Sequence, residues 1–297
     1  MPRPEAISLR SPSAPRVPSL ALDTLWVQVA GTLCNLTCRH CFVSCSPTNH
    51  SHEIMSLAEV RPFLEEAESL GVNDFYFTGG EPFLNRELPE ILKCALRIGP
   101  ATVLTNATLI GAARARELRG LVEASRYSLE VRVSLDGVTA ETNDPIRGEG
   151  SFEATVRGLS ELARVGINPI LTVAQTWSDE EDHALRAGFH EFLSRAGLSR
   201  PRVKVLPLFR IGREVERTRG YAEAERLTEE HWRGFDPWIL QCSTSRMVTS
   251  RGVFVCPILV DAPDARMGRT IRETLRPFRL AHGACYTCWA TGASCRN

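Results

Sequence analysis

At 297 residues the chain is long enough to bury a full hydrophobic core. Hydrophobic residues make up 43% and charged residues 24%, and 35 Lys+Arg against 35 Asp+Glu leave a formal charge of zero. That balance gives no electrostatic argument for a nucleic-acid partner or an anionic membrane surface. No apolar run approaches the roughly 18 residues that span a bilayer. We therefore expect neither nucleic acid nor membrane as a partner.

The first twenty residues hold five prolines and three arginines and lack the apolar core of a signal peptide. We expect a flexible N-terminal arm over residues 1–22. Ten cysteines without an export signal indicate a reducing compartment, in which clustered thiols bind metal more often than they form disulfides. The expected location is therefore cytoplasmic. Four of the cysteines lie within residues 34–45 and five within residues 242–295.

Strand-like and helix-like segments alternate from residue 24 to residue 208. The predicted strands cover residues 24–30, 74–80, 101–106, 128–137, 167–175 and 201–208, and the predicted helices cover residues 56–71, 86–99, 111–124, 151–166 and 179–196. Such alternation predicts a parallel sheet with right-handed crossovers. Six units are fewer than the eight of a closed barrel. The predicted fold is thus α/β, an open, partial (β/α)6 barrel over residues 23–210.

Two further regions follow the predicted barrel. Residues 211–237 have the composition of a charged linker with one helix. Residues 238–297 carry the remaining five cysteines and are predicted to form a small separate domain.

The most distinctive short motifs follow the first four predicted strands. A cysteine-rich loop follows the first, "TGGEP" ends the second, "TNAT" ends the third and "SLDG" ends the fourth. Parallel α/β sheets bind ligands at the carboxyl ends of their strands. These motifs therefore predict one active site on one rim of the barrel.

The loop after the first strand contains Cys34, Cys38 and Cys41 with gaps of three and two residues. A zinc site usually takes paired thiols from two separated knuckles. Iron–sulfur clusters are commonly held by cysteines of a single loop. The spacing favours an iron–sulfur cluster, with zinc as the alternative.

Cys34-x3-Cys38-x2-Cys41 followed by Phe42, with "GGEP" on the next strand of a partial barrel, resembles the signature of the radical S-adenosylmethionine (radical SAM) superfamily. The resemblance implies that the three thiolates hold a 4Fe–4S cluster with one iron open to S-adenosylmethionine. Reductive cleavage of that cofactor gives a 5′-deoxyadenosyl radical, which abstracts hydrogen from a substrate. The cofactors would supply this chemistry while the protein orients the substrate.

The resemblance also assigns a role to "GGEP". Gly79 and Gly80 let the strand end approach the ligand closely. By resemblance, the edge formed with Glu81 and Pro82 accepts hydrogen bonds from the methionine ammonium, supported by the Glu81 carboxylate. A plain strand-to-loop turn is the alternative.

Three further residues are candidates for cofactor binding. Asn106 and Ser134 resemble the positions that hold the ribose or the methionine carboxylate. Arg147 resembles a position in a motif frequent in the subfamily with extra clusters, and its guanidinium suits a carboxylate. Strand-end polar residues and a solvent-facing arginine are the alternatives. No catalytic acid or base can be named.

The remaining side chains near the first thiols are interpreted as structural. A fourth thiolate from Cys45 would block the open iron, so Cys45 is interpreted as a buried or loop thiol. Cys94 lies within a predicted amphipathic helix and is interpreted as a core residue. His40 lies inside the cysteine loop; we interpret it as a loop-surface residue, and a place in the cluster lining is the alternative.

A second group of thiols lies near the C-terminus. Cys242 and Cys256 flank a predicted hairpin that turns at Gly252, and Cys285 and Cys288 have knuckle spacing. Four thiols could therefore converge. Zinc and an iron–sulfur cluster are both compatible with such a ligand set.

This arrangement is similar to the auxiliary-cluster domains called SPASM and, in the shortened form, twitch. The chain ends two residues after Cys295, which favours the shortened form with a second, auxiliary 4Fe–4S cluster. Cys295 departs from the pattern. A structural zinc site stays the alternative.

The resulting hypothesis is an enzyme that oxidises, rearranges or otherwise functionalises a C–H bond of a small-molecule substrate. The auxiliary cluster would assist electron transfer or substrate binding, and a flavodoxin- or ferredoxin-type protein would supply electrons. About two dozen residues precede the first strand, so we expect no N-terminal peptide-recognition domain. A peptide-modifying maturase is one alternative, and a non-catalytic iron–sulfur redox sensor is another. The intact "GGEP" motif favours the enzyme.

Overall fold

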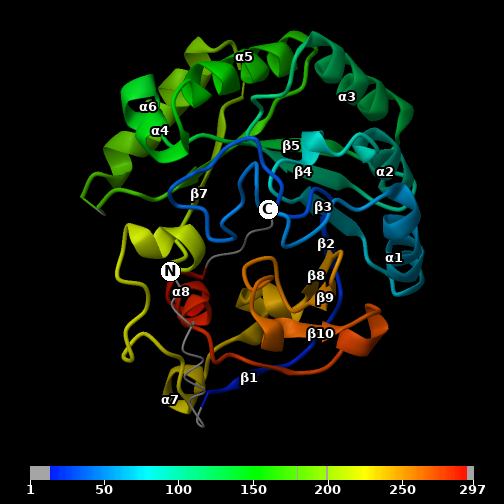
Figure 1. Cartoon of the computed structure of the whole chain (residues 1–297), viewed down its shortest axis with the longest axis vertical. Coiled ribbons are helices and arrows are strands. Elements are labelled where there is room, and N and C mark those ends of the chain that lie inside the picture. The colour runs from blue at the N-terminus through cyan, green and yellow to red at the C-terminus, as the bar shows by residue number, and fades with distance from the viewer. Residues whose placement is uncertain (1–13, 179, 199, 293–297) are drawn as a thin grey trace.

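A curved nine-stranded sheet forms the centre of the protein, in the strand order β10-β9-β8-β2-β3-β4-β5-β6-β7 (Figure 1). The structure, a computed structural model, describes residues 14–178, 180–198 and 200–292. The strands of this sheet are β2 (Thr24–Gln28), β3 (Asp74–Thr78), β4 (Ala101–Thr105), β5 (Leu129–Ser134), β6 (Ile170–Ala174), β7 (Arg202–Leu206), β8 (Ser245–Thr249), β9 (Gly252–Phe254) and β10 (Arg266–Gly268). From β2 to β7 each strand pairs in parallel with the next one along the chain. The predicted partial (β/α)6 barrel is confirmed.

Helices cover the outer face of the barrel (Figure 1). The helices between consecutive barrel strands are α1 (Leu57–Ser69), α2 (Leu88–Ala95), α3 (Ala112–Ala124), α5 (Ser151–Arg164) and α6 (Asp182–Arg195). The first of them begins at a capping box, in which the Ser56 hydroxyl accepts the Glu59 N–H and the Glu59 carboxylate accepts the Ser56 N–H. Three shorter helices are α4 (Ala140–Arg147), α7 (Glu229–Trp232) and α8 (Gly283–Thr291).

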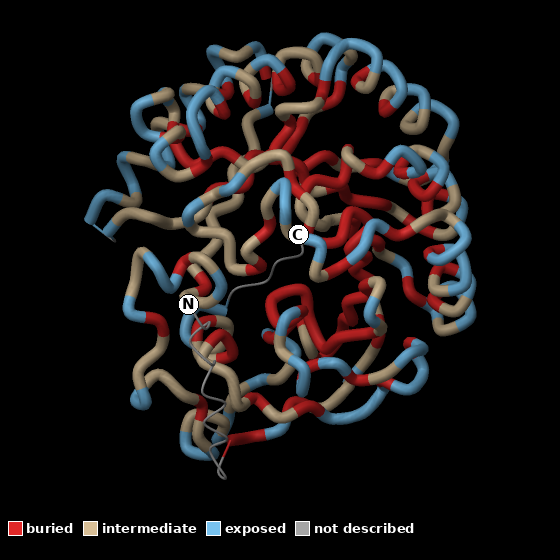
Figure 2. The backbone as a smooth tube through the Cα atoms, in the orientation of Figure 1, coloured by how far each residue is buried: buried red, intermediate tan, exposed pale blue. Residues whose placement is uncertain are grey.

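Both faces of the sheet are apolar, because successive side chains of a strand point to opposite faces. On β2, Leu25 and Val27 pack with the helices in the main core. Trp26, between them, faces a second core, where it stacks on Tyr76 of β3 with ring centroids 4.3 Å apart. Figure 2 shows the buried strands enclosed by helices whose outer faces are exposed.

Residues 14–22 differ from the flexible arm expected for residues 1–22. β1 (Arg16–Val17) pairs antiparallel with β11 (Phe278–Arg279). Val17 is only 1% exposed, and the Leu20 N–H donates to the carbonyl of Ser243 at 2.9 Å. Burial of the Val17 side chain stabilises the packing of residues 14–22 against the rest of the protein. Residues 1–13 lie outside the described residues.

The C-terminal hairpin extends the barrel sheet. β8 pairs in parallel with β2 in the register Thr24↔Ser245 to Val27↔Val248, and β9 pairs antiparallel with β8. The segment predicted as a separate domain therefore begins on the free edge of the first barrel strand. Across the described residues, no helix is both long enough and apolar enough to cross a membrane.

Candidate active site

A cavity lies at the carboxyl ends of the barrel strands. Its volume is about 240 Å³, whereas a single water needs roughly 10–15 Å³ by the same measure. Of the predicted cluster ligands and cofactor-binding residues, those that line it are Cys34, Cys38, Cys41, Gly79, Gly80, Asn106, Ser134 and Arg147. His40, Phe42 and Cys45 of the cysteine loop line it as well. The structure thus brings the motifs of four strand ends to one cavity large enough for a cofactor.

The cysteine loop rests directly on the glycines of "TGGEP". The Gly80 N–H donates to the carbonyl of Gly31 at 2.8 Å, and the Glu81 N–H donates to the carbonyl of Leu33 at 3.0 Å. A Cβ atom on Gly80 would lie 2.0 Å from the Leu33 oxygen, and Gly79 has a φ of +153°. From the sequence, the expected reason for glycine at these positions was close approach of the strand end to a ligand. The structure shows close approach of the loop backbone, which leaves the glycines at the cavity wall.

Glu81 supports the strand ends from behind. It is fully buried and accepts hydrogen bonds from the Thr105 hydroxyl at 2.7 Å and the Asn106 N–H at 2.8 Å. Burial raises its pKa, and these hydrogen bonds oppose that effect. Glu81 and Pro82, which begins a short 3-10 turn at Pro82–Leu84, lie outside the cavity lining. The predicted support of the ligand-binding edge by Glu81 is therefore indirect.

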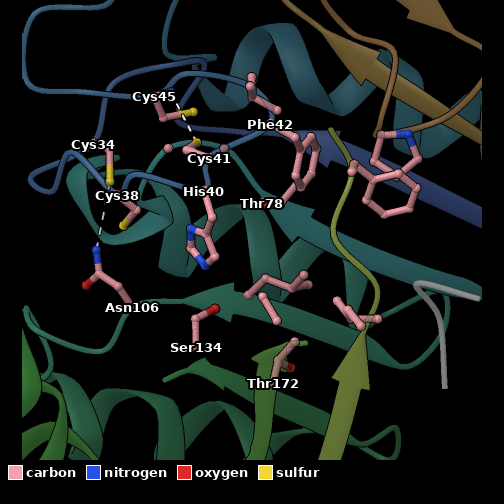
Figure 3. A pocket seen from close by; sticks show the side chains of 18 of the residues that line it. Cys34, Cys38, His40, Cys41, Phe42, Cys45, Thr78, Asn106, Ser134 and Thr172 are labelled. Carbon is pink, nitrogen blue, oxygen red and sulfur yellow. Dashed lines mark hydrogen bonds between the residues drawn. The ribbon is translucent and has the colours of Figure 1, made fainter. Parts of the chain in front are cut away.

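The three motif cysteines lie on one side of the cavity (Figure 3). All three are free thiols. Burial raises the pKa of Cys34 to about 12 and also raises that of Cys38. The charges of Cys38 and Cys41 add to the shift of Cys34, and the charge of Cys41 adds to that of Cys38. Buried thiols that share a cavity match the ligand set of an iron–sulfur cluster.

Cys45 is buried beside Cys41 (Figure 3). Its backbone N–H donates to the Cys41 sulfur at 3.3 Å. A hydrogen bond between the two side chains lowers the pKa of Cys41 and raises that of Cys45. Cys45 is thus a buried thiol that donates to a neighbouring thiolate, a contact that its spacing alone could not reveal.

A buried carboxylate joins two side chains of the cavity wall. Asp136 lies 2.7 Å from His40 Nε2 and 2.7 Å from Arg147 Nε, and it accepts the Ala174 N–H at 2.8 Å. Burial alone would raise its pKa, but Arg147 and His40 hold that pKa well below its usual range. The interpretation of His40 as a surface residue is wrong, because its side chain is 11% exposed and lines the cavity. The carboxylate predicted for Arg147 is Asp136 in this structure.

Asn106 connects the cysteine loop to β4. Its side-chain amide donates to the Asn35 oxygen at 2.9 Å, and the Asn35 amide donates to the Thr108 hydroxyl at 2.8 Å. Ser134, at the end of β5, lies across the cavity from the thiols (Figure 3). Both residues can therefore contact a ligand held between the loop and the strand ends.

The predicted linker, residues 211–237, contacts the backbone of the cysteine loop through Arg213. The Arg213 guanidinium donates to the carbonyls of Cys38 at 2.7 Å and of Ser44 and Cys45 at 3.0 Å. The Arg213 N–H donates to the carbonyl of Cys41 at 3.0 Å. Nothing in the local composition of this segment indicated these contacts, because the partners lie far away in the sequence.

The second group of thiols lies between β9 and α8. Cys256 follows β9, Cys242 lies in the short 3-10 turn Gln241–Ser243, and Cys285 and Cys288 lie on α8 rather than on a knuckle. Burial raises the pKa of Cys242 to about 12 and also raises that of Cys285. The charge of Cys256 adds to both shifts, so these three thiols are close together. Cys295 lies outside the described residues.

Arg246 places a buried positive charge next to these thiols. It is 1% exposed and donates to the carbonyls of Cys242 at 2.8 Å and Thr274 at 2.9 Å. No ion pair to a carboxylate is formed by Arg246 within the described part of the chain. A buried charge is costly without a countercharge, and thiolates at Cys242 and Cys256 would provide one. This charge suits an anionic group bound by thiolates.

Neither group of thiols forms a compact site for a single ion. Over residues 14–178, 180–198 and 200–292, no three His, Cys, Asp or Glu side chains converge closely enough to hold one metal ion. Structural zinc needs four ligands around one ion. A four-iron cluster is wider, so its thiolates are spaced farther apart.

Comparison with known proteins agrees with this geometry. The family profile described as "Radical SAM superfamily" matches residues 29–186, a little over half of the chain. An Fe-coproporphyrin III synthase of Methanosarcina barkeri is 37% identical over 136 residues, which cover 45% of this chain and 32% of that protein. The mycofactocin maturase MftC of Mycobacterium tuberculosis is 34% identical over 135 residues, with the same coverage of 45% and 32%. The matched region spans about a third of the length of these relatives.

Solved structures share the fold over most of the chain. Streptococcus suis SuiB bound to its precursor peptide SuiA superposes with a TM-score of 0.62 at 15% identity, over 91% of this chain and 71% of SuiB. The structure described as native anSMEcpe with bound AdoMet superposes with a TM-score of 0.61 at 16% identity, over 84% of this chain and 80% of that protein. At such low identity these matches establish the architecture alone.

Proposed function

The chain belongs to the radical SAM superfamily, and from this premise we propose that it cleaves S-adenosylmethionine reductively and abstracts a hydrogen atom from a substrate in the same cavity. The family implies a 4Fe–4S cluster and S-adenosylmethionine, which together supply the 5′-deoxyadenosyl radical. The observation that supports the proposal is a set of three motif thiols on one cavity wall, facing strand-end polar groups across the cavity.

In this proposal Cys34, Cys38 and Cys41 hold the cluster and leave one iron open for the cofactor. Asn106 and Ser134 contact the cofactor from the strand ends, together with the backbone of Gly79 and Gly80. Arg147 orients the wall through its ion pair with Asp136, and its position in the lining also lets it meet a cofactor carboxylate.

We further propose that Cys242, Cys256, Cys285 and Cys288 hold an auxiliary 4Fe–4S cluster that accepts or delivers an electron. The buried charge of Arg246 supports an anionic group there. A flavodoxin- or ferredoxin-type protein would act as the external donor. Iron and sulfide counts test this part: about eight irons per chain are expected, and about four would remove the auxiliary cluster.

Two substrate classes are candidates. A small molecule of a biosynthetic pathway is the class favoured by the sequence, and the name of one relative, Fe-coproporphyrin III synthase, fits that class. Peptide modification is the second candidate, supported by the names of the mycofactocin maturase and of the subtilosin biosynthesis protein AlbA of Bacillus subtilis, which is 33% identical over 139 residues.

The test of the main proposal is anaerobic reconstitution with iron and sulfide, followed by an assay for 5′-deoxyadenosine under a strong reductant. We expect 5′-deoxyadenosine to form from S-adenosylmethionine. Absence of cleavage in fully loaded protein would leave a non-catalytic iron–sulfur sensor as the better account.

A further inference from the structure

We propose that the cavity wall formed by β2 and β6 binds a neutral, largely apolar substrate group that carries an amide. Trp26 and Gln28 of β2 and Thr172 of β6 would make its hydrogen bonds. The inference rests on the proposed function, because the substrate must share the cavity with S-adenosylmethionine. It names the substrate class that the family leaves open.

Three polar atoms of this wall have no hydrogen-bond partner among the residues that the structure describes. They are Nε1 of Trp26, Oε1 of Gln28 and Oγ1 of Thr172, and their residues are 1%, 2% and 7% exposed. All three residues line the cavity. Leaving a buried polar group unpaired costs about 1–3 kcal/mol. Three such groups around one cavity indicate a ligand or ordered water that pairs with them.

The fold presents these groups in fixed positions. Trp26 and Gln28 are two residues apart on β2, so their side chains point to the same face of the sheet. The Trp26 ring stacks on Tyr76 at 4.3 Å, which fixes its orientation. Thr172 lies on a different strand and, in Figure 3, across the cavity from the cysteine loop. Because these polar groups are already held in place, they lose little conformational entropy when a ligand binds.

The chemistry of these atoms restricts the ligand. The indole N–H can only donate, and Gln28 Oε1 can only accept. A ligand that satisfies both must present an acceptor and a donor, as the C=O and N–H of a secondary amide do. The Thr172 hydroxyl can take either role.

The apolar part of the surrounding wall disfavours a polyol or a polycarboxylate next to β2 and β6. Apolar residues of the lining include Leu104, Leu206, Phe209, Met247 and Ile258. A polyol would bury most of its hydroxyl groups against such residues without partners. A neutral amide attached to an apolar side chain places each part against a matching surface.

The charged side chains of the lining are already engaged. His40 and Arg147 both pair with Asp136, and in the proposed function Arg147 also faces the carboxylate of the cofactor rather than the substrate. A substrate with several carboxylates would therefore meet no unpaired cation among the described residues of the wall. An amino-acid residue within a peptide, with an aliphatic or aromatic side chain, has the required chemistry, so the cavity favours the peptide candidate.

The test uses reconstituted protein saturated with S-adenosylmethionine and kept unreduced. The probes are N-acetyl-L-leucine methylamide and N-acetyl-L-phenylalanine methylamide, titrated by ligand-observed NMR. The controls are the carboxylate N-acetyl-L-leucine and the polyol myo-inositol. We expect the amides to bind at least tenfold more tightly than either control. Equal affinities, or no measurable binding of the amides, would overturn the proposal.

Three variants identify the residues. Gln28→Met and Thr172→Val are nearly isosteric and remove the side-chain amide and the hydroxyl, and Trp26→Phe removes the indole N–H together with one ring. Each should weaken amide binding about fivefold to tenfold. The matched control is Thr102→Val, because Thr102 is a buried threonine of β4 outside the cavity lining. This variant should leave the affinity for the amides unchanged. Iron content and near-UV circular dichroism identify loaded, folded variants. Unchanged amide affinity in loaded Gln28→Met and Thr172→Val protein would contradict the assignment.

Failure of this inference can be distinguished from failure of the proposed function. Formation of 5′-deoxyadenosine without substrate needs the cluster and the cofactor but not the substrate, so it is measured separately, on wild-type protein and on the Thr102→Val control outside the lining. Wild-type protein that forms no 5′-deoxyadenosine contradicts the proposed function. Wild-type protein that forms it but does not discriminate among the probes contradicts only the substrate class.

Discussion

The Asp136 carboxylate joins parts of the site that are distant in the sequence. His40 belongs to the cysteine loop, Arg147 ends α4, and Ala174 ends β6. All three converge on one fully buried carboxylate. A single side chain therefore helps to fix the cysteine loop above the strand ends.

Asp136→Asn should destabilise the chain by about 3–5 kcal/mol at pH 7, because it leaves the buried Arg147 guanidinium without its countercharge. The folded-state pKa of Asp136 is depressed, so its stabilisation is present above the unfolded pKa, near 3.9, and is lost as pH falls toward the folded pKa. Urea unfolding followed by circular dichroism should give the same loss at pH 7 and at pH 5.

The exposed α6 residue Asp182 provides the control for this prediction. It pairs with Arg186 at the surface, so Asp182→Asn should cost less than about 1 kcal/mol. A loss for Asp136→Asn that already shrinks between pH 7 and pH 5 would contradict a depressed pKa.

Individual site residues could be predicted from the sequence where binding of one ligand fixes the spacing of the residues that hold it. Cys34, Cys38 and Cys41 follow from a ligand set within one loop, and the structure places them at one cavity. His40 was interpreted as a surface residue, with the cluster lining as the alternative, and Cys45 as a buried or loop thiol without a named partner. Their contacts depend on how the loop folds back, and no local pattern encodes that.

At the scale of elements, residues 209–221 connect the two groups of thiols. Gly212, with a φ of +59°, and Arg213 lie against the cysteine loop. Tyr221 packs against α8, where its hydroxyl lies 2.6 Å from the Thr287 hydroxyl. A Cβ on Gly283 would lie 2.3 Å from the Tyr221 ring. The predicted linker is thus a connection between both candidate centres.

Arg213→Gln should loosen the cysteine loop, because it removes charge-assisted hydrogen bonds to three loop carbonyls. We expect iron to leave the Cys34/Cys38/Cys41 centre about tenfold faster, measured anaerobically by transfer to a ferrous chelator. Arg219→Gln is the control, since the Arg219 side chain is 72% exposed. Equal rates of iron loss for both variants would show that Arg213 does not hold the loop.

Secondary structure was predictable where hydrophobic pattern and packing agree. All six barrel strands and the five helices between them form near the predicted residues. Helix α4 was missed because Pro145 and Gly148 resemble loop signals. The pairing of β8 with β2 was missed because it joins residues more than two hundred positions apart, and long-range packing rather than local propensity determines it.

At the scale of the whole molecule, one continuous sheet carries both groups of thiols. The second hydrophobic core, on the concave side of that sheet, includes Cys34, Cys45, Cys256 and Cys285. The partial barrel was predictable from the repeated strand–helix units. The continuity of its sheet with the C-terminal hairpin was not, because composition suggested a separate domain. Cysteines of both candidate centres therefore lie in one apolar interior.

The central claim is that three thiols, and not the fourth, form an open-iron site in this cavity. The most direct test compares 5′-deoxyadenosine formation by Cys41→Ala and Cys45→Ala protein after anaerobic reconstitution. The account predicts that Cys41→Ala abolishes formation and that Cys45→Ala retains it, because Cys45 only donates a hydrogen bond to Cys41. Loss of formation in Cys45→Ala together with its retention in Cys41→Ala would contradict the account.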